Sequence, residues 1–142
     1  MAEVKVKGGG LISGFAWMER SFGDDVLSRV LERLGPERAE VIGRLNPGTW
    51  YDIEYSHLAQ TAFVAVCGFK DRDTILDVML KQGDYIAEDN IKRYYNWLLG
   101  IASPQLLLAQ NPAIWRSYFK GIGVDVERVG NTGGIVTVRG LE

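Results

Sequence analysis

The sequence predicts an α+β domain, in which a layer of five to six helices packs on a small antiparallel β-sheet that includes a C-terminal hairpin. Two observations support this class. Apolar residues recur every three to four positions through most of residues 11–120, which places them along one side of a helix. Residues 3–7 and 124–139 instead alternate apolar and polar side chains, as half-buried strands do. We expect a single domain over residues 1–142, which could itself be a fragment of a longer protein.

Composition and charge argue against several classes of protein. The 142 residues are 46% hydrophobic and 24% charged, which suits a globular domain with its own core. The net charge of −2 disfavours nucleic-acid binding, which needs a concentrated basic surface. One cysteine and one histidine leave no disulfide framework and no zinc site made of several such ligands. Because no apolar run reaches the roughly 20 residues of a membrane span, we expect a cytoplasmic protein without one.

The first part of the chain predicts one strand and two helices. The strand over residues 3–7 ends at the glycine run that follows it. Helices are expected over residues 11–22 and 24–34, and Gly35-Pro36 ends the second of them. Residues 36–48 have the composition of a linker.

A long helix from Thr49 or Asp52 to about Cys67 is the predicted centre of the fold. Apolar residues occupy much of both of its sides, which is typical of a helix enclosed in the protein interior. We therefore expect other helices to cover it on two sides and the C-terminal hairpin to lie behind it.

The second half of the chain predicts further helices and the hairpin. Apolar spacing indicates helix from residue 74 to 102, either as one helix or with a second helix that starts near Ala87. Gly83 lies on the apolar side as a point of close helix–helix contact. Pro104 and Pro112 are each expected to begin a short helix, since proline suits the first turn. Residues 124–139 form two alternating segments around a glycine-rich turn, which predicts a β-hairpin.

Three stretches of the chain resemble one protein superfamily. They are the helix opening Trp50–Tyr55, the segment Leu80–Ile86, and the run Ser103–Phe119 that leads into the hairpin. The chain is similar to the superfamily that groups 4-vinyl-reductase-type domains, heme nitric-oxide-binding domains and the small subunits of the TRAPP vesicle-tethering complex. Within it, the chain resembles a myxobacterial paralogous family of unknown function. The resemblance covers most of residues 10–140 and implies helices on a small antiparallel sheet.

The same resemblance implies a module that binds a ligand or a protein partner. The Tyr-x-Ser-x-Arg motif of the heme-binding branch and the cysteine-rich segment of the vinyl-reductase branch are both absent from this chain. We expect no cofactor, with heme held by His57 as the lesser alternative to a structural histidine. No metal site is expected.

We therefore expect a non-catalytic sensory module that holds a small hydrophobic molecule between the long helix and the helices at 74–102. Its cavity is predicted to combine a few polar groups with aromatic walls. The polar candidates are His57, Gln60 and Tyr95, and the wall candidates are Tyr55, Phe63 and Trp97.

Two other functions remain open at this point. One is a protein–protein scaffold that forms homodimers or heterodimers through an aromatic helical face. The other is an enzyme or a heme-binding sensor, although no Ser/His/Asp or Cys/His pattern is present.

Three further features have structural and functional interpretations. Cys67 is a small buried side chain or a reactive thiol, including an acylation point as in the TRAPP branch. The carboxylates of Asp84 and Glu88 are a solvated helix face or a catalytic pair. The glycines at 8–10 end the first strand or, less favourably, form with Gly14 a strand-to-helix loop that binds the pyrophosphate of a dinucleotide.

Overall fold

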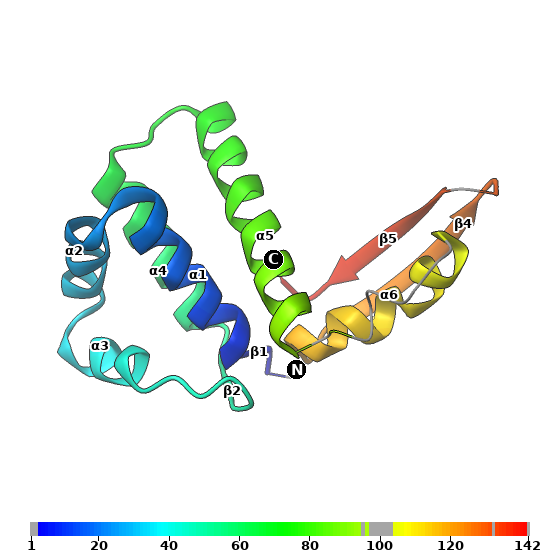
Figure 1. Cartoon of the computed structure of the whole chain (residues 1–142), viewed down its shortest axis with the longest axis horizontal. Helices are drawn as coiled ribbons and strands as arrows, with labels where there is room; N and C mark the ends of the chain where they lie inside the picture. The colour runs from blue at the N-terminus through cyan, green and yellow to red at the C-terminus, as the bar shows by residue number, and fades with distance from the viewer. Residues whose placement is uncertain (1–2, 95, 97–103, 132, 142) are drawn as a thin grey trace.

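The computed structural model describes residues 3–94, 96, 104–131 and 133–141, and its six helices and five strands confirm the predicted α+β class. Figure 1 shows a body of helices α1 to α5 and, to one side, an arm made of α6 and the hairpin β4–β5. The elements are β1 (Lys5–Lys7), α1 (Gly8–Phe22), α2 (Asp24–Leu34), α3 (Pro36–Gly43), β2 (Trp50–Asp52), α4 (Glu54–Cys67), α5 (Arg72–Tyr94), α6 (Pro104–Tyr118), β3 (Phe119–Lys120), β4 (Gly123–Val129) and β5 (Gly133–Arg139).

A three-stranded antiparallel sheet of order β2-β1-β3 joins the body to the arm. Val6 in β1 lies opposite Tyr51 on one side and Phe119 on the other. Strand β2 replaces the helix that was expected to open at residue 49 or 52. The Asp52 carboxylate accepts the backbone N–H of Glu54 at 2.8 Å, so α4 begins only after this strand.

Helix α1 begins at Gly8, three residues earlier than expected, because the glycines belong to the helix. A Cβ at Gly8 would overlap the carbonyl oxygen of Asn46. The N–H groups of Gly8 and Gly9 donate to the carbonyl oxygens of Thr49 at 2.9 Å and Pro47 at 3.1 Å. These two amides of the glycine run therefore bind their own chain, and not a phosphate.

The centre of the body is α1, and the prediction that the helix ending at Cys67 is an enclosed rod is wrong. Helix α1 carries buried residues around most of its circumference and packs against α2 and α5. Helix α4 packs against α2 through one side, where Phe63 is 0% exposed. Its opposite side, with His57 and Thr61, is exposed.

An aromatic cluster in the core fixes the position of α4. Trp17, Phe22 and Phe69 surround Phe63 edge to face, with ring centroids 5.7, 5.1 and 6.0 Å from its own. Such pairs contribute roughly 0.5–1.5 kcal/mol beyond the area they bury. Only one side of α4 contributes to this aromatic cluster, so its opposite side remains exposed to solvent.

Two proline predictions need correction. Pro36 occupies the first turn of α3, so part of the expected linker is a helix. Pro112 lies inside α6, so the two short helices expected from Pro104 and Pro112 are one continuous helix.

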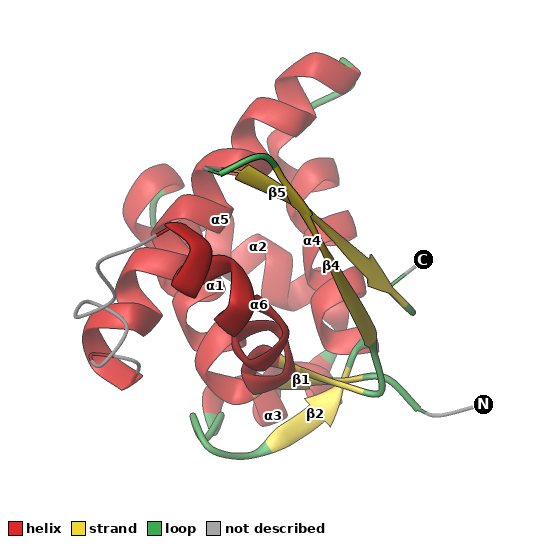
Figure 2. Cartoon of the chain, turned by 90° about the vertical axis from the view of Figure 1, so that its right-hand side faces the viewer, coloured by secondary structure: helices red, strands yellow, loops and turns green. Residues whose placement is uncertain are grey.

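The predicted hairpin is confirmed. Strands β4 and β5 pair in register from Gly123 opposite Arg139 to Val129 opposite Gly133. One of its faces lies against α6, and Figure 2 shows both in front of the helical body. None of the helices in the described part of the chain is long and apolar enough to cross a membrane.

Candidate functional site

An apolar pocket of about 460 Å³ lies where the body meets the arm. This volume falls in the range of about 300–1,000 Å³ found for small-molecule sites. Helices α1, α4 and α5 supply its walls on the body side, and α6 with β3 supplies the wall on the arm side. Its main apolar lining residues are Leu11, Phe15 and Met18 of α1 and Ile114, Trp115 and Tyr118 of α6.

The described side chains that line the pocket carry no charge. Its polar groups are amides and hydroxyls, which come chiefly from Ser56, Gln60, Gln82, Asn111 and Tyr118. A pocket of this kind favours an apolar molecule with few polar atoms, since burial of an uncompensated charge is costly.

Gln82 and Gln60 form a series of hydrogen bonds along one wall of the pocket, and each bond has a fixed donor and acceptor. Gln82, which is 2% exposed, donates through Nε2 to the carbonyl oxygen of Gly14 at 3.4 Å. Its Oε1 accepts from Nε2 of Gln60 at 2.7 Å. The backbone carbonyl of α1 thus orients Gln82, and Gln82 in turn orients Gln60.

This direction leaves the Oε1 atom of Gln60 without a partner. The oxygen is buried, and it has no hydrogen-bond partner in the described part of the chain. An unsatisfied buried acceptor costs roughly 1–3 kcal/mol. The wall of the pocket therefore contains an acceptor that a ligand with a donor could satisfy.

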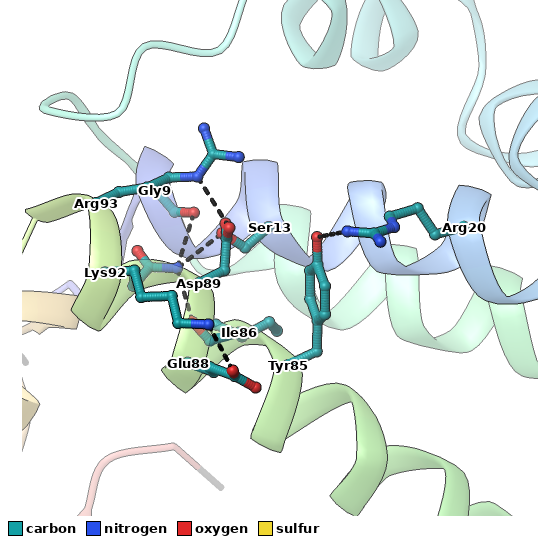
Figure 3. A network of polar contacts seen from close by, with 10 residues as sticks. Gly9, Ser13, Arg20, Tyr85, Ile86, Glu88, Asp89, Lys92 and Arg93 are labelled. Atoms are coloured by element: carbon teal, nitrogen blue, oxygen red, sulfur yellow. Dashed lines mark hydrogen bonds and ion pairs between the residues drawn. The ribbon is translucent and has the colours of Figure 1, made fainter.

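A second polar network holds α5 against α1 (Figure 3). Ser13 Oγ donates to Asp89 Oδ2 at 2.6 Å and accepts from Nδ2 of the buried Asn90 at 2.7 Å. Arg93 Nε donates to Asp89 Oδ1 at 2.9 Å. Burial raises the pKa of Asp89, but the hydrogen bonds from Ser13 and Arg93 and the charges of Arg93 and Arg20 outweigh it. The pKa of Asp89 is therefore lowered.

The structure brings one of the predicted site residues, Gln60, to the pocket wall. Phe63 lies in the aromatic core and Tyr55 packs against Tyr51, and neither is among the residues that line the pocket. His57 is exposed on α4 and also lies outside the lining set. Tyr95 and Trp97 lie outside the described residues.

The pocket does not suit heme. The lining set contains neither histidine nor cysteine, and His57 is exposed on the outer side of α4. Within the described ranges, no group of three His, Cys, Asp or Glu side chains is placed to hold a metal ion.

Sequence reasoning missed the inner face of α5, which carries Val78, Gln82, Ile86 and Asn90 at intervals of four residues. The expected apolar stripe included Gly83, but Gly83 is exposed and a Cβ there would contact nothing within 4 Å. The close approach lies instead at Gly14 of α1, whose added Cβ would lie 3.5 Å from Ile86 Cδ1. The four-residue spacing of the amides with Val78 and Ile86 is the signal that could have identified this face.

Cys67 and Glu88, two further candidates, are not among the residues that line the pocket. Burial raises the pKa of the Cys67 thiol, while the charge of Arg29 opposes this shift only in part, so the reactive thiolate is disfavoured. Glu88 pairs with Lys92 at 2.7 Å, and the hydrogen bond and charge of Lys92 lower its pKa. Both groups of the pair are exposed, as on a solvated helix face.

Fold and pocket together define the chain as an α+β domain with an uncharged apolar pocket between a helical body and an arm. In comparisons with known proteins, no family model, no curated protein and no solved structure matches the chain. Its resemblance to the 4-vinyl-reductase, heme-NO-binding and TRAPP small-subunit superfamily stays a prediction.

Proposed function

We propose that this protein is a non-catalytic sensory module that binds a small hydrophobic molecule in the pocket between its body and its arm. The observation that carries the proposal is the pocket of about 460 Å³, whose described lining is mostly apolar and uncharged. Its amide and hydroxyl groups can orient a ligand through hydrogen bonds. General acid–base catalysis at neutral pH instead depends on side chains whose pKa lies near 7.

The position of the pocket supports a sensory role. A ligand in it would touch α1, α4 and α5 of the body and α6 of the arm at the same time. Because the hairpin packs against α6, binding would stabilise one position of the whole arm relative to the body. The arm would then report that the pocket is occupied.

Native mass spectrometry and solvent extraction of the purified protein test the proposal. We expect a bound apolar molecule, or saturable binding of an added one that changes the fluorescence of Trp115 in the pocket wall. A protein that carries no such molecule and binds none would contradict the proposal.

A matched pair of variants at Gly83 tests whether the ligand binds in this pocket. Gly83 lines the pocket, and a Cβ there meets no neighbour within 4 Å. We expect Gly83→Phe to occupy pocket volume and weaken binding, and Gly83→Ala to leave binding nearly unchanged. His57→Ala, at an exposed position outside the lining, serves as the control for α4.

Homodimerisation is the second candidate function, and exposed leucines favour it. Leu80 on α5 is 68% exposed and Leu76 is 49% exposed, while Leu106 and Leu107 on α6 are 48% and 46% exposed. Exposed apolar residues on a helix can contribute to an interaction surface. Light scattering tests this role, and a strict monomer at high concentration would contradict it. For either function we propose a cytoplasmic location.

A further inference from the structure

We propose that the pocket selects an uncharged, mostly apolar ligand that carries a hydrogen-bond donor, such as a hydroxyl group, and that Gln60 Oε1 accepts this donor. This inference rests on the proposed ligand-binding function. It adds the chemical class of the ligand and the residue that recognises it.

The direction of the glutamine chain makes Gln60 an acceptor. The carbonyl oxygen of Gly14 can only accept, so Gln82 turns its Nε2 toward α1 and its Oε1 toward Gln60. Gln60 must then donate to Gln82 through Nε2. Reversing both amides would place the carbonyl oxygen of Gln82 against that of Gly14, and the resulting repulsion holds the chain in its observed direction.

The last residue of this hydrogen-bond series, Gln60, is part of the pocket wall. Gln60 lines the pocket, and its Oε1 is buried without a donor in the described part of the chain. The terminal torsion of a glutamine has a broad energy profile, so we expect Oε1 to turn toward the donor of a ligand while Nε2 keeps its bond to Gln82. A ligand with a donor would satisfy this oxygen, whereas a ligand without one would leave it unpaired.

The uncharged lining determines the second property that we expect of the ligand, which is the absence of a charge. No lysine, arginine or histidine is among the described side chains that line the pocket. A carboxylate placed there would lose its hydration without gaining a cation as partner. The pocket should therefore discriminate against fatty acid anions and accept the alcohols of the same chain length.

Three probes of ten carbon atoms each test the inference on the intact protein: decanol, its isomer nonyl methyl ether, and decanoate at neutral pH. The alcohol has a donor, the ether has only an acceptor, and the acid is charged. We expect decanol to bind about three- to ten-fold more tightly than the ether, which corresponds to one net hydrogen bond. Decanoate should bind most weakly of the three.

The variant Gln60→Met keeps the length of the side chain and removes its amide. We expect it to bind decanol and the ether with nearly equal affinity, because the acceptor is gone. His57→Gln on the exposed side of the same helix is the matched control and should keep the preference for decanol. The decanol-to-ether ratio of the unmodified protein tests the inference even if Gln60→Met fails to fold.

The outcomes separate this inference from the function on which it rests. If none of the three probes binds, the ligand-binding function and this inference both fail. If decanol and the ether bind the unmodified protein equally, the role of Gln60 is overturned while ligand binding stands. If decanoate binds most tightly, the proposed class of uncharged ligand is overturned.

Discussion

The body and the arm of this protein are stabilised in different ways. In the body, Phe63 and Val30 are both 0% exposed and Met18 is 1% exposed, and helices distant in sequence provide their neighbours. In the arm, Val124 is the buried hydrophobic residue of the hairpin, while Val129 and Ile135 are more than half exposed. The body therefore depends on long-range packing, and the arm depends on strand pairing and one helix.

This difference explains why the pocket lies between the two parts. The hairpin packs against α6, and α6 meets the body through β1 and β3. Contacts between arm and body are thus concentrated around one small sheet. The apolar surfaces of α1 and α6 face each other across the pocket there without closing it. Regions with few buried contacts open at low free energy, as ligand-binding elements often do.

The largest expected effect concerns the core of the body. Phe63→Ala removes the ring at the centre of the aromatic cluster and should lower the free energy of unfolding by about 3–5 kcal/mol. Ile135→Ala, at a position 55% exposed in the arm, should change it by no more than about 0.5 kcal/mol. Urea denaturation of both variants measures the contrast. Losses of equal size would show that the two regions do not differ as described.

A glycine in the hairpin tests whether the arm can loosen by itself. A Cβ at Gly134 would overlap the side chain of Leu108 on α6, so Gly134→Ala should cost about 1–3 kcal/mol through overpacking. We expect faster hydrogen exchange in β4 and β5 with little change in α1 and α2. Thr137→Ala, at an exposed position in β5, is the control. Faster exchange throughout the body would mean that arm and body unfold together.

The Asp89 network should make the contact between α1 and α5 dependent on pH. The pKa of Asp89 is lower in the folded protein than in the unfolded chain, so its contribution to stability is present above the unfolded pKa, near 4. This contribution is lost as the pH falls through the lowered folded value. At neutral pH, Ser13→Ala should cost about 1–2 kcal/mol because it removes two hydrogen bonds, the one donated to Asp89 and the one accepted from Asn90.

Denaturation of the unmodified protein and of Asp89→Asn between about pH 6 and pH 2 measures this dependence. The asparagine variant should lose less stability over that range. An unchanged pH dependence would show that other carboxylates are responsible for the acid sensitivity.

The smallest expected effect is a gain in stability at the edge of the pocket. Gly83 is exposed within α5 and has free space around it, so Gly83→Ala should raise the free energy of unfolding by up to about 1 kcal/mol. Ala87→Gly one turn later, also exposed, is the reverse change and should lower it by a similar amount. A loss of stability in Gly83→Ala would indicate a close contact at this glycine.

The sequence by itself determined the elements that depend on local patterns. The alternation of residues 124–139 and the apolar stripe of residues 24–34 were sufficient to predict the hairpin and α2, because strand and helix periods are properties of short segments. The same kinds of pattern established the α+β class.

Only the tertiary structure decided which helix lies at the centre and which face of α5 turns inward. Helix α4 is apolar on both sides, but the aromatic cluster uses only one of them. Gln82 and Asn90 turn inward because acceptors on α1, more than 60 residues away in the chain, satisfy their amides. Hydrophobic periodicity cannot anticipate such partners, since a buried polar group is stable only once the rest of the fold supplies its hydrogen bonds.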